Sequence, residues 1–119
     1  GVPNTAYYFD GVQSYIEVPA SNAWNVSQYS IAAVVKPTAF NVDPCQGNYI
    51  IARGDAAVPS RWALMFTDNM YNDCNVADTS KFVFETYPGP AALSGSAQYS
   101  PSIVTNNWYT VIATYDGMA

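Results

Sequence analysis

Residues 106–117 constrain the fold more than any other stretch, because they read as one complete β-strand with a turn at each end. Asn106 and Asn107 open the stretch, and Asp116-Gly117, a strong hairpin signal, closes it. Trp, Tyr, Val, Ile and Thr dominate the residues between them, and these side chains suit a pleated sheet. Both faces of the alternating pattern are fairly apolar. We therefore expect an interior strand of packed sheets, with Trp108 in the core.

Similar short strand signals recur along the rest of the chain. The expected strands cover residues 5–9, 13–18, 29–36, 48–52, 61–67, 81–87 and 108–115. Turn-forming residues separate them at intervals of roughly ten residues, and no helical periodicity is present. A length of 119 residues fits one domain. The sequence therefore predicts a single all-β domain over residues 1–119, built as an antiparallel β-sandwich.

Charge and composition exclude several kinds of partner. Charged residues make up only 11% of the chain, and the net charge is −5 with four Lys and Arg in all. So few cations build no basic patch for nucleic acid or anionic lipid. No apolar run has the length of a membrane span. A surface this poor in charge is typical of secreted or surface-assembled proteins, so we expect an extracellular location.

The residue inventory also argues against catalysis. The chain has no His, which removes the commonest general base and the Ser-His and Cys-His nucleophile systems. Glu17 and Glu85 are the only Glu residues, and Glu85 has no second carboxylate at two-residue spacing. A hydrolase with paired carboxylates is therefore not expected. The sequence predicts a protein that is not an enzyme.

Cys45 and Cys74 form either a disulfide or two free thiols. Neither belongs to a CxxC pair, and without His the usual mixed zinc sites are excluded. We favour the disulfide, which implies an oxidising compartment. Closing a loop of this length would stabilise the fold by ~3.5 kcal/mol if the effect is entropic.

Four segments carry a resemblance to a known family. They are Tyr-Phe-Asp-Gly and Ser-Tyr-Ile-Glu-Val-Pro within residues 8–19, Tyr-Ser-Ile-Ala-Ala-Val-Val-Lys-Pro at 29–37, Ile-Ile-Ala-Arg-Gly-Asp at 50–55, and Trp-Tyr-Thr-Val-Ile-Ala-Thr-Tyr-Asp-Gly at 108–117. In this order the chain resembles the laminin-G-like domains, which are jelly rolls of the concanavalin A-like lectin-glucanase type. The resemblance implies a jelly-roll sandwich. It also explains Arg53-Gly54-Asp55 as a basic-Gly-Asp triplet at a strand end, without an integrin receptor.

One departure from the family concerns the strands that follow the Tyr-Asp-Gly turn. Laminin-G-like domains continue there with a strand of the type Leu-Tyr-Val-Asn-Gly and with further strands that complete both sheets. These strands are not found in the printed sequence. We therefore expect the chain to be the N-terminal portion of such a domain, completed by further residues or by a neighbouring chain.

The resemblance also implies a calcium site, because some relatives bind Ca²⁺ at loops on one rim. It points to Asp55, and the long polar stretch 68–80 offers further hard oxygen ligands. The expected metal ligands are Asp55, Asp68, Asn69 and Asp73. The alternative is that these residues are ordinary turn formers whose side chains bond to their own backbone.

Aromatic side chains are candidates for stacking on sugar rings. Trp62 and Trp108 each begin an apolar strand, so we expect them in the core. The expected ligand-binding residues are therefore Trp24, Tyr71 and Tyr87. The leading expectation is an extracellular binding or adhesion module for glycan or protein ligands, with a structural calcium ion. The alternative is a structural subunit of an extracellular filament or surface assembly, a homopolymer joined by intermolecular strand pairing.

Overall fold

The computed structural model is all-β, with antiparallel sheets and one short helical turn in the part of the chain that it describes. That part comprises residues 6–40, 48–54, 61–66, 81–87, 95–99 and 101–117. The secondary structure is the 3-10 helix η1 (Asn22–Trp24) and the strands β1 (Tyr29–Val35), β2 (Tyr49–Arg53), β3 (Arg61–Met65), β4 (Phe82–Tyr87), β5 (Gly95–Tyr99) and β6 (Tyr109–Tyr115). The expectation of an all-β, antiparallel protein is confirmed.

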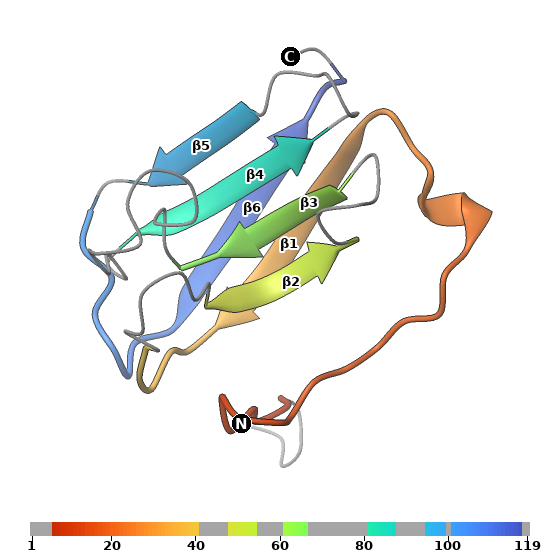
Figure 1. The fold of residues 1–119 in the computed structure, drawn as a ribbon. Coiled ribbons are helices and arrows are strands. Elements are labelled where there is room, and N and C mark those ends of the chain that lie inside the picture. Colours follow the sequence, from red (N-terminus) through yellow and green to blue (C-terminus); the bar gives the residue numbers. More distant parts are fainter. Residues whose placement is uncertain are drawn as a thin grey trace, which may run out of the picture.

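The strands form two sheets. One has four strands in the order β2-β3-β4-β5, and the other has two, β1 and β6. β1 and β6 come from distant parts of the sequence and pair over their full length, from Tyr29 opposite Tyr115 to Val35 opposite Tyr109. Figure 1 shows this pair lying as a second layer behind the four-stranded sheet.

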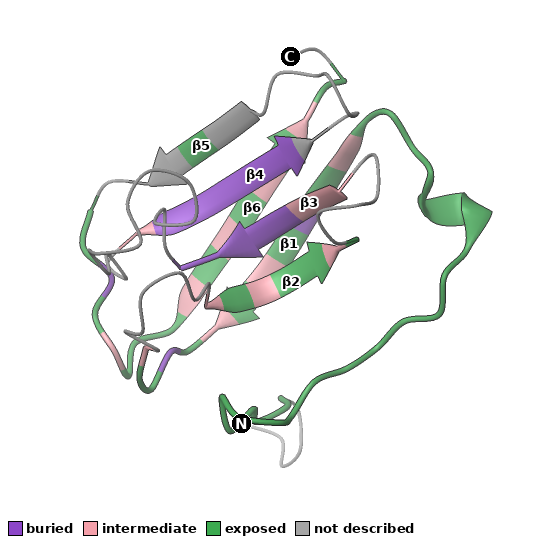
Figure 2. Ribbon diagram, viewed as in Figure 1, coloured by how far each residue is buried: buried purple, intermediate pink, exposed green. Residues whose placement is uncertain are grey.

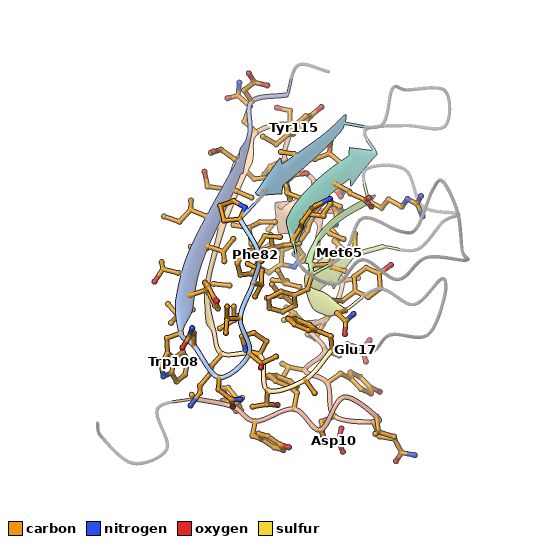
Figure 3. The ribbon with its side chains drawn as sticks, turned by 90° about the vertical axis from the view of Figure 1, so that its left-hand side faces the viewer. Asp10, Glu17, Met65, Phe82, Trp108 and Tyr115 are labelled. Carbon is orange, nitrogen blue, oxygen red and sulfur yellow. The ribbon has the colours of Figure 1, made fainter. Side chains whose placement is uncertain are left out.

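The two layers enclose an apolar interior. Along β6, Tyr109, Val111, Ala113 and Tyr115 are half-buried while the residues between them are exposed, so the strand has one face on the core. This differs from the interior strand that the sequence predicted, since in the described structure β6 has β1 as its one neighbour and its other face is open. Side chains from both sheets meet there. Ile31 of β1 forms one cluster with Leu64 and Phe84. Phe82 of β4 forms another with Phe66 and Ile103, and half-buried residues of β1 and β6 pack against it. Phe82 is seen between the layers in Figure 3.

The central strands of the four-stranded sheet are buried on both faces. Leu64 and Phe84 face the β1–β6 pair, whereas Met65 and Val83 belong to a separate cluster. Because successive side chains alternate, this second cluster lies on the opposite face of the sheet. Figure 2 shows β3 and β4 as the most deeply buried strands.

Residues 6–28 differ most from the sequence expectation. Strands were expected at 5–9 and 13–18, but the described residues from 6 to 28 contain only η1. We call residues 6–21 the N-terminal arm. The arm is exposed along its whole length (Figure 2), with Tyr7 81% and Tyr15 78% accessible. The reason for the wrong prediction is that an alternating sequence becomes a strand only beside a partner, and within the described residues no strand adjoins the arm.

Two further differences concern strand ends. Residues 95–99, expected as a connection, form β5 and pair with β4. Trp108, expected in the core, is 60% exposed and lies just before β6. Since Tyr109 faces the interior, the alternation places Trp108 on the outside, where Figure 3 shows it at the lower end of the strand. Trp62, by contrast, is half-buried and packs against the core, as expected.

Candidate functional site

Only part of the predicted site falls within the described residues. The positions outside them are Cys45, Asp55, Asp68, Asn69, Tyr71, Asp73 and Cys74. Tyr87 is the last residue of β4. Trp24 is the one predicted ligand-binding residue whose side chain is described, so the site is built around it.

Trp24 is presented by a short turn that the local sequence caps. Ser21 precedes η1 in an extended conformation, and its Oγ accepts a hydrogen bond from the Ala23 N–H at 3.2 Å. Serine is a favoured residue at this position because its side chain satisfies an otherwise unpaired amide. The Trp24 N–H donates to the Ser21 carbonyl at 3.1 Å. The turn leaves the Trp24 side chain 51% exposed.

Arg53, the last residue of β2, fastens this turn to the four-stranded sheet. Its Nη1 donates to the Trp24 carbonyl at 2.7 Å, and its Nη2 donates to Oδ1 of Asn25. The Asn25 amide in turn donates to Oδ1 of Asn22 at 3.4 Å. We call Asn22, Trp24, Asn25 and Arg53 the Trp24 corner. Sequence reasoning missed Arg53 because its partners lie 28 and 29 residues earlier in the chain.

Aromatic side chains support the corner from the interior side. Trp62 lies opposite Arg53 in the β2–β3 pairing. Its ring centroid is 5.7 Å from that of Tyr29, which is 5.4 Å from that of Tyr115. Burial, with a smaller effect of Tyr115, raises the pKa of Tyr29 to about 12, although Arg53 acts in the opposite direction. Tyr29 is therefore neutral at physiological pH and serves as a packing residue.

The opposite face of the four-stranded sheet carries a second polar group. Glu85 of β4 is only 4% exposed. Burial raises the pKa of Tyr49, Glu85 raises it further, and Arg61 lowers it. Tyr49, Arg61 and Glu85 are therefore electrostatically coupled. Glu17, the other Glu, lies on the exposed arm.

The Trp24 corner combines an exposed ring, two side-chain amides and a guanidinium group. Such a set can stack on the apolar face of a sugar ring while amide groups bond to its hydroxyls. It can equally hold an extended peptide. Within the described ranges, no three Asp, Glu, Cys or His side chains gather as they would around a metal ion. In the same part of the chain, no helix has the length and apolar character of a membrane span.

Comparisons with protein families, with curated proteins and with solved structures gave no match to this chain.

Proposed function

We propose that the chain belongs to a laminin-G-like, concanavalin A-like jelly-roll sandwich and acts as a non-catalytic extracellular module that binds glycan or protein ligands. The observation that carries this proposal is the Trp24 corner. Trp24 is half-exposed on a capped turn, and Arg53 fixes the turn through the Trp24 carbonyl and the Asn25 side chain. An exposed aromatic ring on a fixed backbone has only two side-chain torsions to restrict, so it binds with little loss of conformational entropy.

The jelly-roll part of the proposal rests on the two layers and on the resemblance. β1 and β6 pair across most of the sequence, and their apolar face packs on a sheet of consecutive antiparallel strands. Completion of both sheets by further strands would give the sandwich. A structural calcium ion held by Asp55, Asp68, Asn69 and Asp73 also belongs to the proposal.

Replacement of Trp24 by Ala tests the binding site. We expect Trp24→Ala to weaken binding to an immobilised glycan or extracellular-matrix protein by roughly tenfold, the equivalent of one lost aromatic stacking contact. The melting temperature should stay that of the parent, because the Trp24 side chain is half-exposed and Arg53 bonds to its backbone carbonyl. The measurement is a glycan and matrix-protein array followed by calorimetry of the best ligand.

Trp108→Ala is the matched control, because Trp108 is similarly exposed, at 60% against 51% for Trp24. This variant should bind like the parent. Equal loss in both variants would mean that the corner is not the site. If the parent protein bound no ligand on the glycan or matrix-protein array, the proposed binding function would be contradicted.

A second candidate function is favoured by the N-terminal arm. Its large apolar side chains include Tyr7, Tyr8 and Val12, each about four-fifths exposed at 81%, 79% and 83%. Apolar side chains gathered on a surface indicate an interaction site. The arm therefore supports a structural subunit that joins an extracellular filament or surface assembly by strand pairing.

A further inference from the structure

The arm contains a segment with the properties of a strand that has no partner. The backbone of residues 15–18 makes no hydrogen bond with another residue that the structure describes. Tyr15, Ile16 and Val18 are 78%, 57% and 64% exposed. In an extended chain Ile16 and Val18 point to one side and Tyr15 and Glu17 to the other. Pro19 then ends the run.

β1 offers the complementary edge. In the described structure it pairs with β6 on one side only, within a two-stranded sheet. An open edge of this kind carries unpaired backbone donors and acceptors and serves as a template for another strand. The inward side chains of β1 are the buried Ile31 and the half-buried Ala33 and Val35. A strand beside them with Ile16 and Val18 directed inward would extend the same apolar layer and leave Glu17 outward in water.

Within the described residues, the arm does not pair with this edge in its own chain. Arg53 fastens residues 24 and 25 to the end of β2, which belongs to the four-stranded sheet and not to the β1–β6 pair. From that anchor the arm passes down beside the two layers without pairing with them and curves back beneath them (Figure 1), with Asp10 below the body of the protein (Figure 3).

We propose that the arm of one copy adds its residues 15–18 as an antiparallel strand to the open edge of β1 in a second copy. Exchange of an identical segment between copies forms an assembly at little cost, because the same contacts are made in every copy. The main-chain hydrogen bonds supply affinity, and the inward Ile16 and Val18 fix the register. This inference rests on the second candidate function, the assembly subunit, and names its donor segment, acceptor edge and partner.

The first test is the mass of the 119-residue protein in solution, measured by light scattering at micromolar concentration. The parent is expected to have at least twice the 12.9 kDa mass of one chain. The double variant Ile16→Pro/Glu17→Pro should return to the single-chain mass. Backbone N–H groups of a strand point alternately to its two sides, so two adjacent prolines remove a ladder hydrogen bond in either orientation. Ala20→Pro, in the same arm but beyond the strand segment, is the control and should remain assembled.

A second test leaves the chain unchanged. A synthetic peptide of residues 12–19, added in excess to the parent, should compete for the β1 edge and lower the mass to that of one chain with a peptide bound. Hydrogen exchange should show that the β1 amides on the open edge, which do not face β6, exchange more slowly in the assembly and in the peptide complex than in a single chain.

Two results would overturn the inference. A parent that is monomeric at 100 µM would remove both the arm exchange and the subunit function. A double-proline variant that keeps the parent's mass, with no effect of the peptide, would exclude the arm while leaving assembly through another surface. Ligand binding at Trp24 is measured separately, so its success or failure is independent of either result.

Discussion

Asp10 shows how one side chain shapes the arm without any contact to the core. Its Oδ1 accepts hydrogen bonds from the backbone N–H groups of Val12, Gln13 and Ser14 at 2.9, 3.1 and 3.0 Å. These bonds stabilise the carboxylate and hold the pKa of Asp10 well below its ordinary value. Gly11, with φ of +73°, permits the backbone to turn around the carboxylate. The Asp-Gly pair therefore makes a turn, although the described residues on either side of it form no hairpin.

Tyr29 gives a prediction for the dependence of stability on pH. The folded chain keeps the Tyr29 proton until about pH 12, because burial and Tyr115 raise its pKa from 10.0. The unfolded chain loses this proton near pH 10. The contribution of Tyr29 to stability is thus complete below pH 10 and is lost as the pH rises toward 12. An absorbance titration should show that Tyr29→Phe removes one tyrosinate transition near pH 12. Loss of a transition near pH 10 instead would contradict this assignment.

Between strands, the joint of β1 and β6 depends on Gly117. The Gln28 side-chain amide donates to the Asp116 carbonyl at 2.7 Å, which ties the start of β1 to the end of β6. Gly117 has φ of +84°, and a Cβ added there would lie 2.8 Å from the Ser27 carbonyl oxygen. Both the backbone conformation and the close approach require glycine at this position.

Gly117→Ala is therefore expected to lower the free energy of unfolding by about 1–3 kcal/mol in urea denaturation. Gly11→Ala is the matched control, because Gly11 has a similar φ of +73° but no atom within 4 Å of the added Cβ. Gly11 also lies on the exposed arm, so its strain should leave the unfolding of the two sheets nearly unchanged. Equal destabilisation by both substitutions would show that the contact with Ser27 has no role.

The strands show what local sequence can predict. β1, β2, β3, β4 and β6 were all expected within one or two residues of their ends, because β-branched and aromatic residues fill them and turn formers flank them. β5 (Gly95–Tyr99) was missed, since small residues carry no strand signal and β4 alone imposes the pairing. The prediction that Trp108 lies in the core was wrong for a related reason. Its position one residue before Tyr109 decides which face it takes, and composition does not reveal that register.

At the scale of the whole molecule, the candidate site was harder to predict from the sequence than the fold. Trp24 was expected as a ligand-binding residue, because it lies on a polar turn outside the expected apolar strands. The contribution of Arg53 depends on packing the turn against the end of β2, and such contacts between distant segments leave no local signal. The calcium ligands and the Cys45–Cys74 disulfide remain predictions, because these residues lie outside the described ranges.

The proposed calcium ion leads to a prediction for the whole domain. Calcium at a hundred times its dissociation constant should stabilise the folded state by about 2.7 kcal/mol and raise the melting temperature, since only the folded chain holds the site together. Chelation should reverse the shift, and Asp55→Asn should reduce it. Glu17→Gln, which removes an exposed carboxylate on the arm, is the control for charge alone and should keep the full response. A melting temperature that is the same with and without calcium would exclude the site.

The pairing of β1 with β6 also delays the folding of β1 during synthesis, because its partner strand is made much later. Gln28 and Asp116, which bond at the joint of these strands, lie 88 residues apart. At a translation rate of roughly 5–20 residues per second, β1 waits on the order of 4–18 s before β6 has been made. Throughout that interval an apolar strand with two open edges is available to any other nascent chain nearby. Yield in the cell should therefore depend on how densely ribosomes occupy the message as well as on the stability of the finished fold.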